Sequence, residues 1–428
     1  MHRGARTNEL PKALRAAHEA RLLSERDSPL ALFYDLDALD SSVDALFQAL
    51  PFQHAFAIKA NPVRTILERL VARGMGLECA SITEVEMAIL VNAPASRVVF
   101  DSPCKSHNDL QRALALGVHV NCDSFEELDR VAELYLRVHS TSIVGIRINP
   151  LLGLGQIEAL SVSDPTSKFG VPLTAENKAR VLQCFRQHAF LTSLHAHVGS
   201  QGCSPEMLAD GARILTELAC EVGQQVVHLD IGGGLPANFG SDETTPTFDV
   251  YAAALRKAAP SLFDARWKVT TEFGRALVAK TGWVASFVEY VKEAGGRRIA
   301  AIHAGSDLFV RTCYKPEDFA LRVQVFEGAK GGFEAKRSAP SRVHDVVGPL
   351  CFGGDKIARV VQLPSIDVGD VVVVRDAGAN TLSLFSRHCS RRAPPVLGYR
   401  RDAQGRVDVV VLKEEEALAD VIRFWGFL

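Results

Sequence analysis

The sequence predicts an α/β domain followed by a mainly β domain. From residue 30 to about residue 285, short apolar runs alternate with amphipathic helical stretches, the size and rhythm of a parallel (β/α)8 barrel. Beyond residue 285 the alternation stops, and strand-like runs are separated by Gly, Pro and Asp clusters. Polar, glycine-bearing segments follow the predicted strand ends, which favours a barrel over a doubly wound open sheet. We therefore expect a barrel over residues 30–285 and a β domain over residues 286–428, with residues 1–29 packing against the latter.

Composition excludes several classes of protein. With 428 residues, 47% of them hydrophobic, the chain can bury a large core in two domains. A formal net charge of -2 gives no reason to expect a nucleic-acid partner. No apolar run approaches the roughly 18 residues of a membrane span, and no apolar segment follows the basic N-terminus. The nine cysteines are scattered without a CxxC pair. We expect a reduced, cytoplasmic protein with no metal site and no membrane contact.

Each predicted element follows from local pattern. Val43, Leu46 and Phe47 have helical spacing, and Ser81 or Thr83 can cap a helix that carries acidic residues in its first turn. The predicted strands of the first domain are residues 31–34, 52–58, 75–80, 97–100, 118–121, 142–149, 190–198, 226–231 and 268–272. Those of the second domain are residues 299–302, 320–326, 345–347, 371–375 and 407–412, followed by an amphipathic helix over 414–427.

Lys59 stands at the end of the apolar run 55–58, just before the Asn61-Pro62 turn. In one interpretation its stem is buried and its ammonium reaches water. In the other, desolvation lowers the pKa of the amine, which then acts as a nucleophile that forms a Schiff base. The residues at later strand ends decide between the two.

Three later strand ends carry residues with chemical potential. His197 and Ser200 follow one strand, at the end where barrel active sites lie. The run Gly232-Gly233-Gly234 follows the next, and consecutive N–H groups in such a turn can converge on a phosphate. The last strand ends in Glu272, Gly274 and Arg275. A lysine able to form a Schiff base, a phosphate cradle, an imidazole and a buried carboxylate together predict a site for pyridoxal 5'-phosphate.

The order of these motifs resembles the alanine-racemase-fold (type III) pyridoxal-phosphate decarboxylases, which include diaminopimelate, ornithine and arginine decarboxylases. The resemblance extends from about residue 30 to residue 400. It implies that Lys59 carries the cofactor as an internal aldimine, that His197 stacks on the pyridine ring, and that Glu272 faces the ring nitrogen. The residues implied to hold the phosphate are Ser200, Gly232, Gly233, Gly234, Gly274 and Arg275. A carboxylate at the ring nitrogen keeps it protonated, which makes the ring an electron sink.

The second domain continues the resemblance. The segment 348–355 contains Gly-Pro-Leu-Cys and is similar to the family's catalytic-cysteine loop. Cys351 would then donate a proton in the active site of a partner subunit, which implies a homodimer. The segment 304–311 resembles the one whose arginine binds a substrate carboxylate in diaminopimelate decarboxylases, which nominates Arg311.

Two positions depart from the diaminopimelate pattern. Phe352 stands where those relatives have a glutamate for the distal amino group of the substrate, and a phenyl ring cannot neutralise an ammonium. Asn380 replaces a tyrosine that touches the cofactor phosphate. The following loop is cationic, and we expect Arg387 and Arg391 to contact the substrate unless the loop is simply solvated.

These departures predict decarboxylation of a small-molecule amino acid with an anionic distal group, such as a citryl-diaminopropionate siderophore precursor. Within the class, the alternative is meso-diaminopimelate decarboxylation to lysine, and ornithine-type activity fits less well because no acidic pair is placed for a terminal amine. Outside the class, the alternatives are a non-catalytic pyridoxal-phosphate-binding regulator and a racemase. The presence of both Lys59 and Cys351 favours the enzyme.

Overall fold

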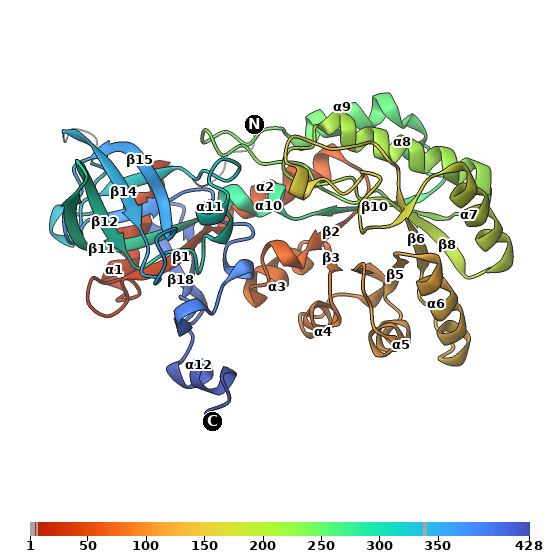
Figure 1. The fold of residues 1–428 in the computed structure, drawn as a ribbon, viewed down its shortest axis with the longest axis horizontal. Helices are drawn as coiled ribbons and strands as arrows, with labels where there is room; N and C mark the ends of the chain where they lie inside the picture. Colours follow the sequence, from red (N-terminus) through yellow and green to blue (C-terminus); the bar gives the residue numbers. More distant parts are fainter. Residues whose placement is uncertain (1–4, 6, 337–339) are drawn as a thin grey trace. The chain divides into compact units, whose positions relative to one another are not determined.

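The computed structural model describes residue 5, residues 7–336 and residues 340–428, and these form two compact units (Figure 1). We call residues 43–237 and 245–276 the barrel unit. The β unit comprises the described residues among 1–42, 238–244 and 277–428. None of the helices in the described part of the chain is both long enough and apolar enough to cross a membrane.

The barrel unit contains a closed ring of parallel strands in the order β5-β4-β3-β2-β10-β9-β8-β6, and pairing of β5 with β6 completes the ring. This confirms the predicted (β/α)8 barrel. The short strand β7 (Val171–Pro172) pairs with β6 after the ring. The ring strands are β2 (Gln53–Ala57), β3 (Gly76–Cys79), β4 (Val98–Asp101), β5 (His119–Cys122), β6 (Val144–Asn149), β8 (Leu191–His195), β9 (His228–Asp230) and β10 (Lys268–Phe273).

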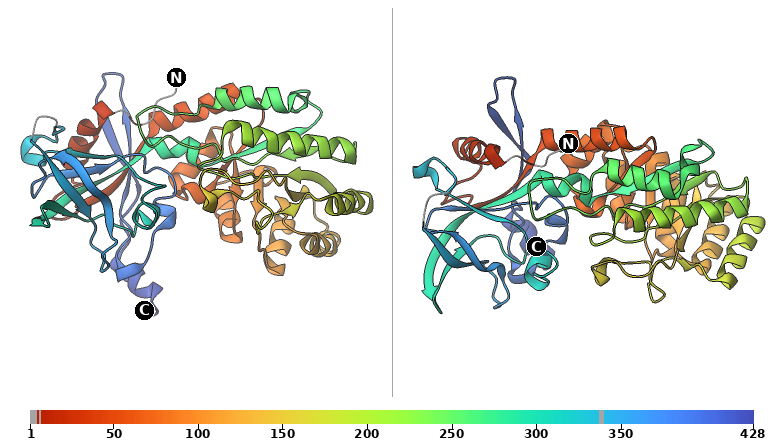
Figure 2. Two further views of the ribbon diagram at one scale, coloured as in Figure 1. Left: turned by 45° about the horizontal axis from the view of Figure 1, so that its top comes forward. Right: turned by 90° about the horizontal axis from the view of Figure 1, so that it is seen from above.

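Helices surround the strands of the barrel unit, as the views in Figures 1 and 2 show. The chain enters the unit through α2 (Leu36–Ala49). Six of the following helices begin at a Ser or Thr side chain that accepts a backbone N–H of the first turn, which satisfies a donor that the helix leaves unpaired. These caps are Ser81, Ser106, Ser124, Thr174, Ser204 and Thr247. The helices are α3 (Arg64–Ala72), α4 (Ile82–Leu90), α5 (His107–Leu116), α6 (Phe125–Arg137), α7 (Ala175–Gln187), α8 (Pro205–Val222) and α9 (Phe248–Ala258).

The β unit contains a sheet of order β15-β14-β12-β11-β1-β17-β18, in which β16 pairs with both β11 and β13. Helix α1 (Leu10–Glu19) buries Leu10 and Leu14 in the core of this unit, where Phe33 stacks on Trp283 with ring centres 4.1 Å apart. The strands are β1 (Leu30–Asp35), β11 (Gly282–Ala294), β12 (Arg297–Ile302), β13 (Val323–Phe326), β14 (Ser341–Val347), β15 (Lys356–Pro364), β16 (Val371–Val374), β17 (Val396–Arg401) and β18 (Val407–Lys413). The short helices of this unit are α11 (Val310–Tyr314) and α12 (Leu418–Phe424), and α10 (Arg275–Val278) spans the division between the two units.

The structure corrects the predicted domain boundaries. Residues 31–34, expected as the first barrel strand, belong to β1, which pairs with β11 and β17 of the β unit. A strand that is buried on both faces has the same apolar sequence pattern in either sheet, so the pattern alone could not assign residues 31–34 to one of the two sheets. The barrel unit therefore begins at residue 43 and ends at residue 276, where residues 30 and 285 were expected. The closing helix is also shorter than the predicted 414–427.

Three histidines lie near the starts of barrel strands: His54 on β2, His119 on β5 and His228 on β9. With neighbouring residues they line a cavity of about 100 Å³. Burial, together with the nearby His228 ring, lowers the pKa of His119 to about 3, and burial lowers that of His54 to about 4. His54 is held by the Thr271 hydroxyl, 2.8 Å from its Nδ1. These rings are therefore neutral in the folded barrel at pH 7.

The depressed pKa of His119 predicts acid destabilisation of the barrel. Below about pH 6.5 the unfolded chain binds a proton that the folded chain refuses until about pH 3. Stability contributed by neutral His119 is thus full above pH 6.5 and falls as the pH decreases, by up to about 1.4 kcal/mol per pH unit. We expect the loss of Tm between pH 7.5 and pH 5.0 to be smaller in His119→Gln than in the wild type. Exposed His107→Gln is the control, and equal losses in all three proteins would contradict the prediction.

Candidate active site

Lys59 lies in the single 3-10 turn η2 (Ile58–Ala60) that follows β2. Its neighbours Ile58 and Ala60 are buried, whereas its own side chain is 51% exposed. The Nζ atom lies 2.5 and 2.6 Å from the two carboxylate oxygens of Glu78, a fully buried residue of β3. The turn therefore presents the amine at the carboxyl end of the barrel strands, as the sequence predicted, but in an ion pair that was not predicted.

The charges around Lys59 correct the expected direction of its pKa. Burial does act to lower the pKa of the amine, but the carboxylates of Glu78 and Glu272 outweigh it and raise the pKa above its ordinary value. Burial and the neighbouring carboxylate of Glu272 raise the pKa of Glu78 to about 7, against the opposing effect of Lys59. In this structure Lys59 is therefore an ammonium held by a carboxylate, and it must lose a proton before it can act as a nucleophile.

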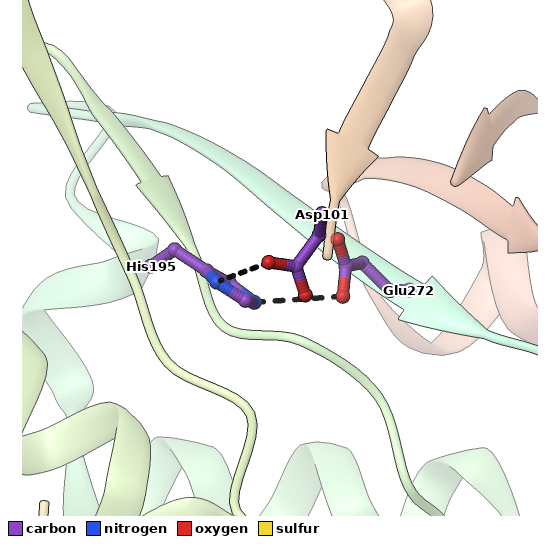
Figure 3. Close-up of side chains that lie close together, drawn as sticks. All are labelled: Asp101, His195 and Glu272. Atoms are coloured by element: carbon purple, nitrogen blue, oxygen red, sulfur yellow. Dashed lines mark ion pairs between the residues drawn. The ribbon is translucent and has the colours of Figure 1, made fainter. Parts of the chain in front are cut away.

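Asp101, His195 and Glu272 meet inside the barrel from the ends of β4, β8 and β10 (Figure 3). All three are buried. His195 Nδ1 lies 3.7 Å from Asp101 Oδ1, and its Nε2 lies 3.5 Å from Glu272 Oε2. The guanidinium of Arg147 on β6 donates to the other oxygen of Asp101 over 2.8 Å. One imidazole thus lies between two carboxylates, one of which is paired with a buried arginine.

Glu272 has the electrostatics of an ionised carboxylate. Burial would raise its pKa, yet His195 and other neighbours lower the pKa below the ordinary value. Its Oε1 atom is buried and has no hydrogen-bond partner among the residues that the structure describes. A buried, ionised oxygen without a donor is costly, so this atom fits a cationic N–H group brought by a ligand. The protonated nitrogen of a pyridine ring is such a group.

His197 follows β8 and accepts a hydrogen bond at Nδ1 from the Gly233 N–H, 3.2 Å away. Burial and the nearby Arg147 lower the pKa of His197 to about 3, so the ring is neutral at pH 7. A neutral imidazole with one nitrogen held by the backbone is a fixed, flat surface, as stacking on a heteroaromatic ring requires. The hydrogen bond brings together two predicted site elements, His197 and the glycine turn.

The glycine turn is needed because the backbone passes very close to the adjacent strand ends. A Cβ at Gly233 would lie 1.9 Å from the carbonyl oxygen of Glu272, and one at Gly234 would lie 1.9 Å from that of Gly199. Gly232 and Gly234 also have positive φ angles of 63° and 101°. This packing explains the three glycines without a ligand. Their role in holding a phosphate remains a prediction.

The remaining predicted phosphate residues lie at neighbouring strand ends of the barrel unit. A Cβ at Gly274 would lie 2.8 Å from the Cβ of Ala60, so this glycine permits close packing beside the Lys59 turn. Arg275 is buried at the start of α10, and Ser200 lies in the turn after β8. Loops at the same end of the ring thus carry all of them, which is the arrangement expected of a barrel site.

Sequence reasoning did not select Glu78, Asp101, His195 or Asp230. His195 could have been found, because alternate residues of a strand face the same side and His195 precedes His197 by two. The other three are acidic residues in or at the ends of otherwise apolar strands, a signal that was present but not used. Asp101, His195 and Glu272 also place three possible metal ligands within 4.8 Å of one another, although Arg147 already neutralises part of their charge.

In the β unit, Asp355 joins the two segments predicted from the resemblance. Its carboxylate accepts the N–H of Ser306 and the N–H of Leu350, each over 2.6 Å. A third segment joins them because Ser386 N–H donates to the Asp307 carbonyl over 2.8 Å. The segments 304–311, 348–355 and 385–392 therefore form one loop cluster.

Cys351 is exposed in this loop cluster, and its thiol contacts that of Cys389. The contact raises the pKa of Cys351 above its ordinary value, so the sulfur keeps its proton. The ring of Phe352 stacks on Tyr314 with centres 5.4 Å apart and meets His388 edge-on at 6.3 Å. An aromatic group thus occupies the position next to the cysteine.

The arginines of the cationic loop have acidic partners within the β unit. Arg387 forms a two-pronged pair with Glu416 at 2.5 and 2.6 Å, and Arg391 lies 3.4 Å from Asp307. Arg311 differs, because its Nη1 is buried without a hydrogen-bond partner in the described chain. Burial lowers the pKa of Arg311. Of the three predicted substrate-binding arginines, Arg311 is therefore the one whose charge a ligand would balance.

Comparison with known proteins agrees with this geometry. The family model described as "Pyridoxal-dependent decarboxylase, pyridoxal binding domain" matches residues 36–279, more than half of the chain. The chain belongs to the pyridoxal-dependent decarboxylases. The family confirms the resemblance in the sequence, and it makes the chain a carbon–carbon lyase that uses pyridoxal phosphate.

The relatives agree over most of their length. The diaminopimelate decarboxylase of Helicobacter pylori is 28% identical over 377 residues, covering 86% of this chain and 87% of the relative. That of Deinococcus radiodurans is 31% identical over 370 residues, covering 86% and 89%. The crystal structure of the H. pylori enzyme complexed with L-lysine superimposes with a TM-score of 0.80 at 25% identity, over 95% of this chain and 99% of that one.

The residues of the barrel site fit the cofactor of this decarboxylase. Lys59 would supply the amine, His197 a neutral ring, and Glu272 a buried anionic oxygen that no described residue satisfies. When bound, pyridoxal phosphate supplies the electron sink for the pair of electrons that the departing CO2 leaves behind. The carboxylate of Glu272 would hold a proton at the ring nitrogen, and Glu78 would accept or return the proton of Lys59 because the pKa of Glu78 is about 7.

The ion pair predicts that Glu78 controls how easily Lys59 loses its proton. In Glu78→Gln the opposing charge is absent, so the pKa of Lys59 should fall. We expect the rate of cofactor attachment to cofactor-free protein, followed by absorbance from pH 6 to pH 10, to reach its half-maximum about one pH unit or more lower. Glu86→Gln on α4, whose carboxylate pairs with Arg112, is the control. An unchanged pH profile would show that the pair does not govern the amine.

Replacement of Lys59 tests its role as the cofactor-bearing residue. We expect Lys59→Ala to lose the visible absorbance band of the covalently held cofactor, and to lose CO2 release with it, because the proposed linkage uses the Lys59 amine. Lys178→Ala on α7, which removes an exposed lysine paired with Glu221, should leave both unchanged. A persistent band in Lys59→Ala would assign the linkage to another lysine.

Proposed function

We propose that this decarboxylase acts on an amino acid whose distal end carries carboxylate and no free ammonium, such as a citryl-diaminopropionate siderophore precursor. The observation that carries the proposal is Phe352, packed against Tyr314 and His388 beside Cys351. A distal ammonium placed against this aromatic group would lack an anionic partner, at a cost of several kcal/mol. An uncharged or anionic distal group avoids this cost.

The anionic end of the substrate has one clear partner in the β unit. Arg311 is half-buried and has an unused donor within the described chain, whereas Arg387 and Arg391 already face Glu416 and Asp307. We therefore propose that Arg311 binds a substrate carboxylate directly. Arg387 and Arg391 would contribute only if the substrate displaced their acidic partners, which makes their role in binding secondary.

We further propose a cytoplasmic homodimer in which Cys351 of one subunit donates a proton in the site of the other. The raised pKa of Cys351 supports this role, because a donor must hold its proton at working pH. Asn380, in a left-handed conformation with φ of 53°, would contribute a hydrogen bond to the cofactor phosphate. Ser200, Gly232, Gly233, Gly234, Gly274 and Arg275 would hold the rest of that phosphate.

Meso-diaminopimelate decarboxylation to lysine is the second candidate. The named relatives at 28–31% identity are diaminopimelate decarboxylases, which supports it. Diaminopimelate also has a distal carboxylate that Arg311 could bind. Only its distal ammonium conflicts with Phe352, so this residue distinguishes the two substrates.

A side-by-side assay of CO2 release separates the candidates. The cofactor-loaded protein is offered citryl-diaminopropionate, meso-diaminopimelate, ornithine, lysine and arginine at equal concentrations. Release from the citrate-linked substrate alone would support the proposal. Efficient release from meso-diaminopimelate, with none from the citrate-linked compound, would replace it with the second candidate.

Substitution of Phe352 tests the reason for the preference. In Phe352→Glu a carboxylate returns beside Cys351, and we expect kcat/KM for meso-diaminopimelate to rise at least about tenfold, because one charge gains a partner. Phe352→Leu is the matched control, since it removes the ring without adding charge. An equal rise in both variants would mean that space rather than charge sets the specificity.

A further inference from the structure

Two buried carboxyl groups lie side by side at the centre of the barrel site. Asp230 ends β9 and Glu272 lies near the end of β10, and these strands are adjacent and parallel. Burial and the negative charge of Glu272 raise the pKa of Asp230 well above its ordinary value, which favours the protonated form of Asp230. The pKa of Glu272 moves in the opposite direction although it is buried as well. A neighbouring group must determine whether Asp230 or Glu272 is the ionised carboxyl group.

His195 is the group that distinguishes them. Its Nε2 faces Glu272 at 3.5 Å, and its Nδ1 faces Asp101 at 3.7 Å. Each ring nitrogen, when it carries the hydrogen, can donate toward the carboxylate that it faces. Neither ring nitrogen has another hydrogen-bond partner in the described part of the protein.

The carboxylate of Asp101 is held in place by Arg147. Arg147 donates to its Oδ2 over 2.8 Å and is packed on the ring of Phe169. Burial opposes ionisation of Asp101, but Arg147 and His195 hold its pKa below the ordinary value. The result is a chain of ionisable side chains, Arg147–Asp101–His195–Glu272, in which each member faces the next, and we call it the charge chain. The ionisable groups around Glu272 and His195 on packed elements are Lys59, Glu78, Asp101, His119, Arg147, His197 and Asp230.

We propose that His195 is a positioning residue which, held by Asp101, keeps the negative charge of the carboxyl pair on Glu272 rather than on Asp230. This inference rests on the proposed placement of Glu272 at the ring nitrogen of the cofactor. A neutral Glu272 could not hold a proton on that nitrogen, and the ring would be a weaker electron sink. His195 acts on the cofactor only through Glu272, and His195 need not contact the cofactor.

A metal ion could use the same three side chains, but two observations favour the charge chain. Arg147 occupies one side of Asp101, and the cationic Lys59 acts on Glu272. An additional divalent cation would be repelled by both. Glu272 would also be withdrawn from the ring nitrogen if it ligated a metal.

The test uses full-length protein loaded with pyridoxal phosphate labelled with 15N in the ring, whose nitrogen signal reports protonation directly. His195→Gln keeps a polar side chain but cannot carry charge. We expect its ring signal to move toward the unprotonated position, and cofactor affinity and kcat to fall about 10- to 100-fold, the range typical for loss of an outer partner of an ionised ligand. Asp101→Asn should move the signal in the same direction by less, which provides a second variant if His195→Gln folds poorly.

His119→Gln is the control, because it replaces another buried histidine of the barrel, and its signal should match the wild type. Glu272→Gln is the reference for a lost carboxylate. If Glu272→Gln shifts the signal and both His195→Gln and Asp101→Asn leave it unchanged, His195 has no such role. If Glu272→Gln itself leaves the signal unchanged, the proposed placement of Glu272 fails. Stoichiometric Zn²⁺ binding that disappears in His195→Gln would overturn the charge chain in favour of a metal site.

Discussion

The structure of the barrel unit depends on how it keeps several carboxylates ionised away from water. Glu78, Asp101 and Glu272 are buried near the carboxyl ends of barrel strands, and burial raises the free energy of each charged form. Lys59 and Arg147 supply compensating charges, and His195 faces the carboxylates of Asp101 and Glu272. Such groups add little to stability compared with apolar packing, so their presence is better explained by the chemistry they permit.

The same balance produces different proton affinities in chemically similar groups. Glu78 faces Lys59 and has a pKa of about 7, while Glu272 faces His195 and remains ionised. Burial and the negative charge of Glu272 raise the pKa of Asp230, which favours its protonated form. Glu78 can therefore exchange protons with Lys59, and Glu272 can hold a cation. Asp230 favours its neutral form beside Glu272. Divergent pKa values of this kind are typical of sites that carry out acid–base chemistry.

Much of the fold could be predicted from the sequence, because the eight ring strands are short apolar runs separated by amphipathic helices. The run 31–34 was assigned to the wrong sheet, since a fully buried strand carries no mark of its partners. In the site, Lys59, His197 and Glu272 could be selected because each stands out at a strand end. Glu78 and Asp101 were not assigned roles, because their function depends on contacts between side chains of different segments of the chain. The ion pairs of Arg387 and Arg391 were missed for the same reason.

The loop cluster of the β unit shows how specificity can change while the scaffold stays the same. Asp355 binds backbone N–H groups of two segments, and Gly305 and Gly348 leave room for its carboxylate. These contacts fix the backbone around Cys351 without involving the side chain at position 352. That side chain is therefore free to be an aromatic ring or a carboxylate without disturbing the cysteine. Phe352 stacks on Tyr314, which lies outside the cluster, so replacing Phe352 changes which charge the loop presents and leaves the supporting hydrogen bonds intact.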